Sequence, residues 1–178
     1  LEGRGTVTQI AVAEEQFSNH PLRAGKGSPY EGGIRVPFIV RWPGHIEAGS
    51  TCQTPVHVID LLPTLLEVAG AKVPSDHAVD GVSLVPLWKQ SGKLEPRDLF
   101  WYLPLYDLRW GATPCAVIRD GDEKLIEYFG DSFNSQRRYV PGHRLELYNL
   151  ANDLGEQHNL ADKQPERARE LQAKLHRW

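Results

Sequence analysis

Several features that would narrow the function at once are missing from this sequence. Its 178 residues contain no methionine and only two cysteines, Cys52 and Cys115. Two cysteines are too few for a disulfide framework, although they could form one bridge; as buried thiols they would act as small apolar side chains. The formal charge is −3, from 20 basic and 23 acidic side chains. No dense basic stripe is visible, which argues against nucleic acid as the main partner.

Long apolar runs and processing signals are also missing. No stretch approaches the roughly 20 apolar residues that a membrane-spanning helix needs, and the first residues show no targeting pattern. There is no Asn-x-Ser/Thr acceptor for glycosylation, which fits a bacterial source. A chain that starts at Leu1 without methionine fits either a trimmed product or a piece of a longer protein. We favour the second, because the glycine-rich run described next looks like the middle of an active site.

The most informative run is residues 22–37, in which Lys26 stands between two glycines and four of the nine residues from 25 to 33 are glycine. Glycine lets the backbone approach a bound group closely and adopt positive φ, and lysine is a point cation suited to an oxyanion. A P-loop would need Ser or Thr after the lysine and an earlier glycine, where this chain has Gly27 and His20. The alternative to an anion site is an ordinary solvated loop lysine.

The first half of the chain predicts part of an α/β layer. Residues 1–33 hold many turn formers, which predicts an irregular loop with at most a short helix at 11–17. The β-favouring run 36–42 predicts a strand buried on both faces. A helix is expected over 61–69, largely buried, with Asp60 as its N-cap. A strand followed by a buried helix is typical of α/β architecture.

The second half predicts a small α+β unit after a connector rich in proline and glycine. Four β-favouring runs indicate an antiparallel sheet: residues 99–103, 115–119, 124–129 and 145–149. The middle two flank Asp120-Gly121, a hairpin signal. Pro165 begins the clearest helix. Its apolar stripe should cover one face of the sheet and consists of Ala168, Leu171, Leu175 and Trp178.

The order of these motifs resembles that of type I sulfatases, in the alkaline phosphatase superfamily. The shared landmarks are Gly25-Lys26-Gly27, residues 30–35, Trp42-Pro43-Gly44, Asp60 with Pro63-Thr64, residues 80–84, Arg119-Asp120-Gly121 with 124–126, residues 147–150, and Asp153, Glu156 and Asn159-Leu160. The resemblance runs from about Ser18 to Trp178. It implies an α/β protein: the end of an alkaline-phosphatase-like α/β sheet domain in residues 1–95, then a small α+β subdomain in 96–178 with a four-stranded antiparallel sheet and a C-terminal helix.

The resemblance also implies a sulfate site. Lys26 would be catalytic: it would bind a sulfate oxygen and stabilise charge on the ester or leaving oxygen. Asn19, His20 and Arg23 precede the lysine and are expected to line the substrate pocket. His20 is an acid or base by residue type, although a surface histidine is an equal interpretation.

Other charged residues of these landmarks are expected to be structural. Glu31 and Arg35 should form an ion pair that braces the loop. Asp153 and Glu156 flank a glycine in an expected turn and do not match a calcium loop. Tyr102 stands where many relatives carry histidine. If its side chain reaches the pocket, the family's substrate assignments do not transfer; the alternative is that it only packs the edge of the sheet.

Two parts of the family's active site have no counterpart in the sequence. The nucleophile, formylglycine, forms from cysteine in Cys-x-Pro/Ala-x-Arg; Cys52 precedes Gln-Thr-Pro, and Cys115 has Val117 where proline or alanine is needed. The aspartate and asparagine ligands for calcium are absent too, so no metal ligand is expected in this chain. Ca²⁺ and formylglycine are therefore expected in the intact enzyme, from residues outside this chain.

The resemblance implies a sulfuric ester hydrolase that acts on a sulfated small molecule or glycan, in the periplasm or secreted from a bacterium. The isolated chain should be inactive and should associate with the missing N-terminal part of the enzyme or with itself. Two alternatives stay open. One is a phosphate or phosphonate ester hydrolase of the same superfamily, and the other is a non-catalytic module that binds anions or glycans.

Overall fold

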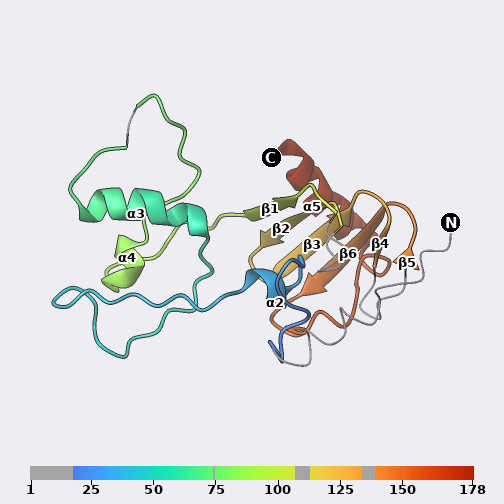
Figure 1. Ribbon diagram of the computed structural model, residues 1–178, viewed down its shortest axis with the longest axis horizontal. Coiled ribbons are helices and arrows are strands. Elements are labelled where there is room, and N and C mark those ends of the chain that lie inside the picture. The colour runs from blue at the N-terminus through green and yellow to red at the C-terminus, as the bar shows by residue number, and fades with distance from the viewer. Residues whose placement is uncertain (1–17, 74, 107–112, 134–138) are drawn as a thin grey trace. The chain divides into compact units, whose positions relative to one another are not determined.

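The computed structural model describes residues 18–73, 75–106, 113–133 and 139–178. The chain divides into two compact units, one made of residues up to 37 together with 97–178, the other of 38–96 (Figure 1). The segment that carries Lys26 thus belongs to the same unit as the C-terminal sheet. The boundary expected after residue 95 concerns domains of the intact protein and stays a prediction. The short helix expected at 11–17 lies outside the described residues.

The first unit is built on a four-stranded antiparallel sheet in the order β1-β2-β3-β6. The strands are β1 (Leu99–Leu103), β2 (Cys115–Asp120), β3 (Glu123–Tyr128) and β6 (Arg144–Asn149). The β2–β3 hairpin turns at Gly121, whose φ of 60° favours glycine. This sheet confirms the prediction. Two short strands were not predicted: β4 (Ser132–Phe133) pairs with β5 (Tyr139–Val140).

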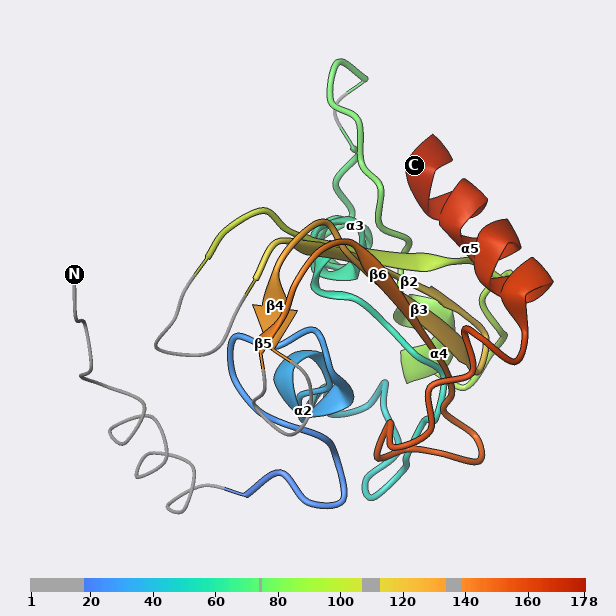
Figure 2. The same cartoon turned by 90° about the vertical axis from the view of Figure 1, so that its right-hand side faces the viewer.

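Helix α5 (Pro165–Arg177) covers one face of this sheet, as predicted (Figure 2). Side chains alternate between the two faces of a strand, so every second residue of β2 and β3 meets the helix. The core on this face consists of Ala116, Ile118, Leu125, Leu147, Ala168, Leu171 and Leu175. Trp178 completes the predicted stripe only in part: it is 62% exposed but stacks on Phe100 with ring centroids 4.8 Å apart.

The opposite face of the sheet receives the N-terminal segment through Tyr30 and the short helix α2 (Glu31–Ile34). Tyr30 is 5% exposed and packs among side chains of β2, β3 and β6. The full core on this face consists of Tyr30, Cys115, Val117, Ile126, Tyr128, Tyr148 and Leu150. Tyr30 and α2 therefore form an integral layer of the first unit.

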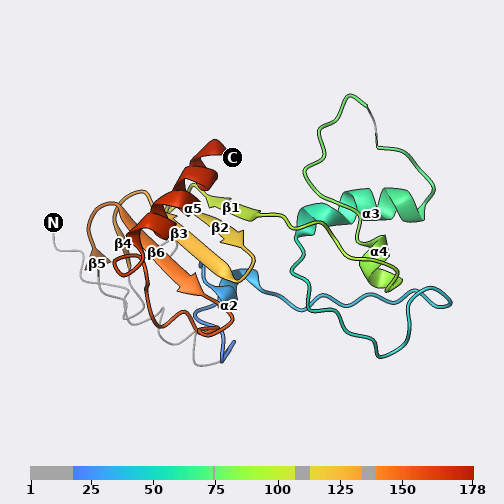
Figure 3. The same cartoon turned by 180° about the vertical axis from the view of Figure 1, so that it is seen from behind.

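The second unit contains the 3₁₀ turn η1 (Val58–Asp60), α3 (Leu61–Val68) and α4 (Val85–Trp88), with α3 and α4 in contact (Figure 3). The predicted helix is confirmed, and Asp60 is its N-cap residue as expected, but the Asp60 side chain does not cap it. The buried Asp60 carboxylate accepts the backbone N–H groups of His57 at 2.8 Å and Val82 at 3.0 Å, and makes no capping bond to α3. Asp60 thus joins η1 to the segment before α4. None of the described helices is long and apolar enough to span a membrane.

The buried strand expected at 36–42 is wrong for this chain. These residues form no strand, and Val36 and Ile39 are 71% and 88% exposed. The burial expected for α3 is wrong as well, since Leu62 and Leu65 are more than half exposed. A strand needs a neighbour for its backbone hydrogen bonds, and among the described residues none pairs with 36–42. The sequence pattern therefore indicates apolar surfaces on residues 36–42 and α3 that are exposed in the described part of the chain.

Candidate functional site

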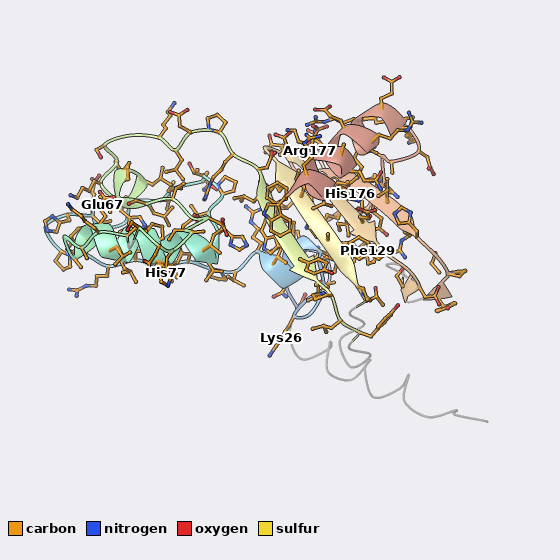
Figure 4. The ribbon with its side chains drawn as sticks, turned by 90° about the horizontal axis from the view of Figure 1, so that it is seen from above. Lys26, Glu67, His77, Phe129, His176 and Arg177 are labelled. Carbon is orange, nitrogen blue, oxygen red and sulfur yellow. The ribbon has the colours of Figure 1, made fainter. Side chains whose placement is uncertain are left out.

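Lys26 lies on an exposed loop just before α2. Two backbone hydrogen bonds shape the loop: Leu22 N–H donates to the Asn19 carbonyl at 2.8 Å, and Ser28 N–H donates to the Gly25 carbonyl at 3.1 Å. Figure 4 shows the Lys26 side chain extending from this loop away from the sheet. The loop therefore presents an ammonium group on the surface of the first unit.

The glycine pair of α2 lets the Lys26 loop approach very closely. The Gly32 N–H donates to the Arg23 carbonyl at 2.9 Å. A Cβ atom at Gly32 would lie 2.3 Å from the Ala24 oxygen, and one at Gly33 would lie 2.2 Å from the Ser28 oxygen. Real Cβ atoms do not come so close to backbone oxygens, so only glycine fits at these positions. The sequence pattern predicted that the glycines allow close contact with an anion. The structure gives two of them, Gly32 and Gly33, a packing role.

Two of the residues expected to line the pocket also hold the loop. Asn19 Nδ2 donates to the Gly32 carbonyl at 2.9 Å. The Arg23 guanidinium lies over the Tyr30 ring, 3.6 Å from its centroid, and donates to the Tyr148 hydroxyl at 2.9 Å. His20 is exposed on the same loop. The structure thus places Asn19, His20 and Arg23 on the same loop as Lys26, and their contact with substrate stays a prediction.

A fully buried lysine on β3 ties α2 to the sheet. Lys124 is 0% exposed, and its Nζ lies 3.0 Å from Glu31 Oε1 and 2.8 Å from Glu156 Oε1. Glu156 Oε2 also accepts the Glu31 backbone N–H at 2.7 Å. The guanidinium groups of Arg35 and Arg119 lie 3.6 and 3.7 Å from Glu31 Oε2, so the expected pair of Glu31 with Arg35 is present. Buried charges persist only when they are paired in this way.

Another buried carboxylate, that of Glu146 on β6, anchors Tyr30, the residue before Glu31. Its Oε2 accepts the hydroxyls of Tyr30 at 2.8 Å and Tyr148 at 2.9 Å, while Oε1 accepts two N–H groups of Arg144. Burial and the nearby Glu146 charge raise the pKa of both tyrosines well above their usual range. The hydroxyls are therefore hydrogen-bond donors to the carboxylate, and Tyr30 and Glu31 form two adjacent anchors.

Another carboxylate group lies on the α5 face of the sheet and is unconnected to the loop. Glu127, 3% exposed, accepts hydrogen bonds from Gln172 at 2.8 Å and contacts His143 and His176 at 2.8 and 2.7 Å. Burial raises the pKa of Glu127, but these hydrogen bonds outweigh it, so the pKa is lowered overall. The group links β3 to α5 and to the residue before β6.

Sequence reasoning missed Lys124, Glu146 and Glu156 as anchors. One signal was present: Lys124 lies at alternate spacing with Ile126 and Tyr128, so all three belong to one face of β3. A lysine on a core face indicates a buried partner. Glu156 gave no such signal, because a glutamate beside glycine in a turn is usually solvated.

The cysteines and carboxylates do not gather into a metal-binding group in the described part of the chain. Both thiols are free; Cys52 is exposed, contrary to the expectation of burial, and Cys115 is buried. Burial, with the Glu146 charge, raises the pKa of Cys115 to about 12, so it is an unreactive thiol. Among the described residues no three His, Cys, Asp or Glu side chains could hold a metal ion. The buried glutamates face cationic partners, which makes them unsuitable for calcium.

Comparison with known proteins gives one consistent result. Residues 25–178 match the family model for the C-terminal part of N-sulphoglucosamine sulphohydrolase. A sulfatase of Formosa agariphila is 39% identical over 174 residues, covering 90% of this chain and 30% of its own length. Bovine arylsulfatase A is 37% identical over 163 residues, covering 85% of this chain and 31% of its own length. The chain thus spans about a third of these relatives.

Solved structures agree with the sequence matches. A protein from a Bacteroides thetaiotaomicron locus for the metabolism of multiple glycosaminoglycans aligns with a TM-score of 0.69 at 27% identity, over 86% of this chain and 31% of its own. A structure in complex with a neocarrahexaose aligns with a TM-score of 0.66 at 30% identity, over 90% of this chain and 32% of its own. Because the family model covers most of the chain and these neighbours share its fold, the chain belongs to the sulfatase family and matches its C-terminal portion.

Proposed function

We propose that this chain is the C-terminal part of an enzyme that hydrolyses sulfate esters, and that its Lys26 binds the sulfate group. The observation that carries the proposal is the loop of residues 22–28, where an exposed lysine is held by close backbone packing against Gly32 and Gly33. A cation held in place before the substrate arrives stabilises developing negative charge without reorganisation. The family match supports sulfate as the anion.

The substrate is proposed to be a sulfated small molecule or glycan. One structural neighbour was solved with its substrate D-glucosamine-2-N,6-O-disulfate, and it aligns with a TM-score of 0.58 at 28% identity. Lys26 would contact a sulfate oxygen, and Asn19, His20 and Arg23 would line the pocket beside it. A periplasmic or secreted bacterial location fits relatives from Formosa and Bacteroides.

The chemical step is assigned to residues outside this chain. Calcium and formylglycine, when bound or formed there, would supply the Lewis acid and the nucleophile. The exposed apolar side chains of the second unit, among them Ile39, Leu62 and Leu65, fit a surface that the N-terminal part of the enzyme covers. We therefore propose that the isolated chain does not turn over an aryl sulfate.

Activity assays test this proposal directly. The purified 178-residue chain should show no hydrolysis of 4-nitrophenyl sulfate, and the intact enzyme that contains it should. In the intact enzyme Lys26→Ala should lower kcat/KM by about 10²–10³, the range seen when one donor to an oxyanion is removed. Lys163→Ala, another exposed lysine of the same unit, is the matched control and should have no effect. Steady hydrolysis by the chain alone would refute the proposal.

Two further measurements separate the alternatives. A phosphate or phosphonate ester hydrolase would cleave 4-nitrophenyl phosphate or its phosphonate analogue faster than the sulfate. A non-catalytic anion-binding module would bind sodium sulfate as the isolated chain, at constant ionic strength, and lose that binding in Lys26→Ala. Absence of binding in both proteins would remove the module hypothesis and leave the enzyme proposal intact.

A further inference from the structure

We infer that Lys124 is a positioning residue for Lys26: through Glu31 and Glu156 it fixes the segment on which the Lys26 loop rests. The inference rests on the proposed role of Lys26 in sulfate binding. Lys124 is on β3, nearly a hundred residues along the chain from Lys26, and is buried where no substrate could reach it. Its effect on the site must therefore pass through other residues.

The first step of that connection joins the loop to α2. The Arg23 carbonyl accepts the Gly32 N–H, and Asn19 Nδ2 bridges from the start of the loop to the Gly32 carbonyl. Backbone atoms of residues 23–28 lie against Gly32 and Gly33 with no room for a side chain. A displacement of α2 would therefore displace the loop with it.

The second step joins α2 to the sheet through charge. Glu31 is the first residue of α2, and its carboxylate lies 3.0 Å from Lys124 Nζ. Lysine has three donors, which lets one ammonium serve carboxylates from two segments. Here the second carboxylate, Glu156, also accepts the Glu31 backbone N–H. The ammonium therefore holds α2 and the turn after β6 at one point.

The turn after β6 completes the connection at the other end of the loop. Glu156 has a φ of 50°, a left-handed conformation that costs energy for a residue other than glycine. In that conformation its backbone carbonyl accepts Arg23 Nη1 while its carboxylate meets Lys124. Arg23 precedes Lys26 by three residues and Glu31 follows it by five. The loop is thus fastened on both sides to the Lys124 centre.

If position 124 had only to fill the core of the sheet, an apolar residue would be sufficient there. The surrounding face is formed by Val117, Ile126 and Tyr128, and buried ion pairs are frequently no more stable than apolar replacements. The lysine is required only if α2 must be held in one place and orientation. This difference between stability and positioning makes the inference testable.

The test is amide hydrogen exchange on the 178-residue chain carrying Lys124→Met, together with sulfate titration of the intact enzyme that carries the same substitution. The amides of Glu31 and Gly32 should exchange at least about tenfold faster, since local opening exposes them, while those of β2 and β3 keep their protection. Sulfate affinity, measured with sodium sulfate at constant ionic strength, should fall about tenfold, or about 1.4 kcal/mol. Lys174→Met is the matched control: it also removes one cation with two carboxylate contacts, to Asp120 and Asp98, but on the α5 face. It should change neither readout.

A second variant keeps the inference falsifiable if Lys124→Met loses the sheet. Glu31→Gln keeps the side-chain shape and leaves Lys124 paired with Glu156, so the sheet should persist while the same two amides lose protection. Unchanged exchange at Glu31 and Gly32 in the folded variants would overturn the inference, and so would equal loss in β2 and β3 in Glu31→Gln. If instead Lys26→Ala retains full sulfate affinity, the proposed function fails, and the exchange data still decide whether Lys124 fixes the loop.

Discussion

Replacement of Gly32 by alanine is the sharpest perturbation of the candidate site. The new Cβ would meet two backbone oxygens, of Ala24 at 2.3 Å and Arg23 at 2.4 Å. Neither oxygen can rotate away, so the loop must lift from α2 and the Gly32 N–H bond to Arg23 must lengthen. Overpacking of this kind costs about 1–3 kcal/mol, and loss of the hydrogen bond adds about 1 kcal/mol. Alanine's lower backbone entropy returns about 0.5–1 kcal/mol, which leaves a net loss of about 1–3.5 kcal/mol.

The assay is urea unfolding followed by tryptophan fluorescence, with Gly25→Ala as the matched control. Gly25 lies in the same loop beside Lys26, but the nearest atom to its added Cβ is Asn19 Nδ2 at 3.4 Å, an ordinary contact. Gly25→Ala should therefore change the free energy of unfolding by less than about 0.5 kcal/mol, as for most surface substitutions. If both variants unfold at the same urea concentration, the loop does not rest on α2 as described.

Three further outcomes are expected. Because the pKa of Glu127 is lowered, its ionised form stabilises the fold above its ordinary pKa of 4.5, and this stability is lost as pH falls through the lower folded value. In Glu127→Gln the urea midpoint should therefore fall less steeply between pH 6 and 3. An unchanged slope would contradict this role of Glu127. At pH 8 a thiol reagent should label Cys52 in the native chain and Cys115 only after unfolding; two fast thiols would contradict the burial of Cys115. Tyr148→Phe removes a hydroxyl that is hydrogen-bonded to Glu146 and should lower the free energy of unfolding by about 1–2 kcal/mol. Calorimetry would measure this loss, and an unchanged unfolding transition would contradict it.

The elements of the C-terminal part were predictable because the apolar face of each one packs against residues of the same chain. Alternation in β2 and β3, the Gly121 turn and the α5 stripe find their partners within residues 97–178, so local signals and tertiary packing agree. Residues 36–42 and α3 carry equally clear apolar patterns, yet Ile39 and Leu65 are exposed. Periodicity indicates that an apolar surface is buried in the folded protein, but it does not indicate which segment of polypeptide buries it.

The candidate site was predictable in composition but only partly in architecture. Glycine beside lysine identified the loop, because that pattern is local. The partners of Tyr30 and Glu31 lie 116 and 125 residues away, in Glu146 and Glu156. No single-sequence periodicity links positions at such separations.

These separations also set the order in which the first unit can be made. Its two pieces are divided by the whole of residues 38–96, so the segment with Tyr30 leaves the ribosome long before β6 and the turn at Glu156 exist. Closure of so long a loop must await synthesis of the chain through Glu156. A premature stop shortly before β6 would therefore leave the Lys26 loop without its anchors, although every residue of the loop itself had been translated correctly.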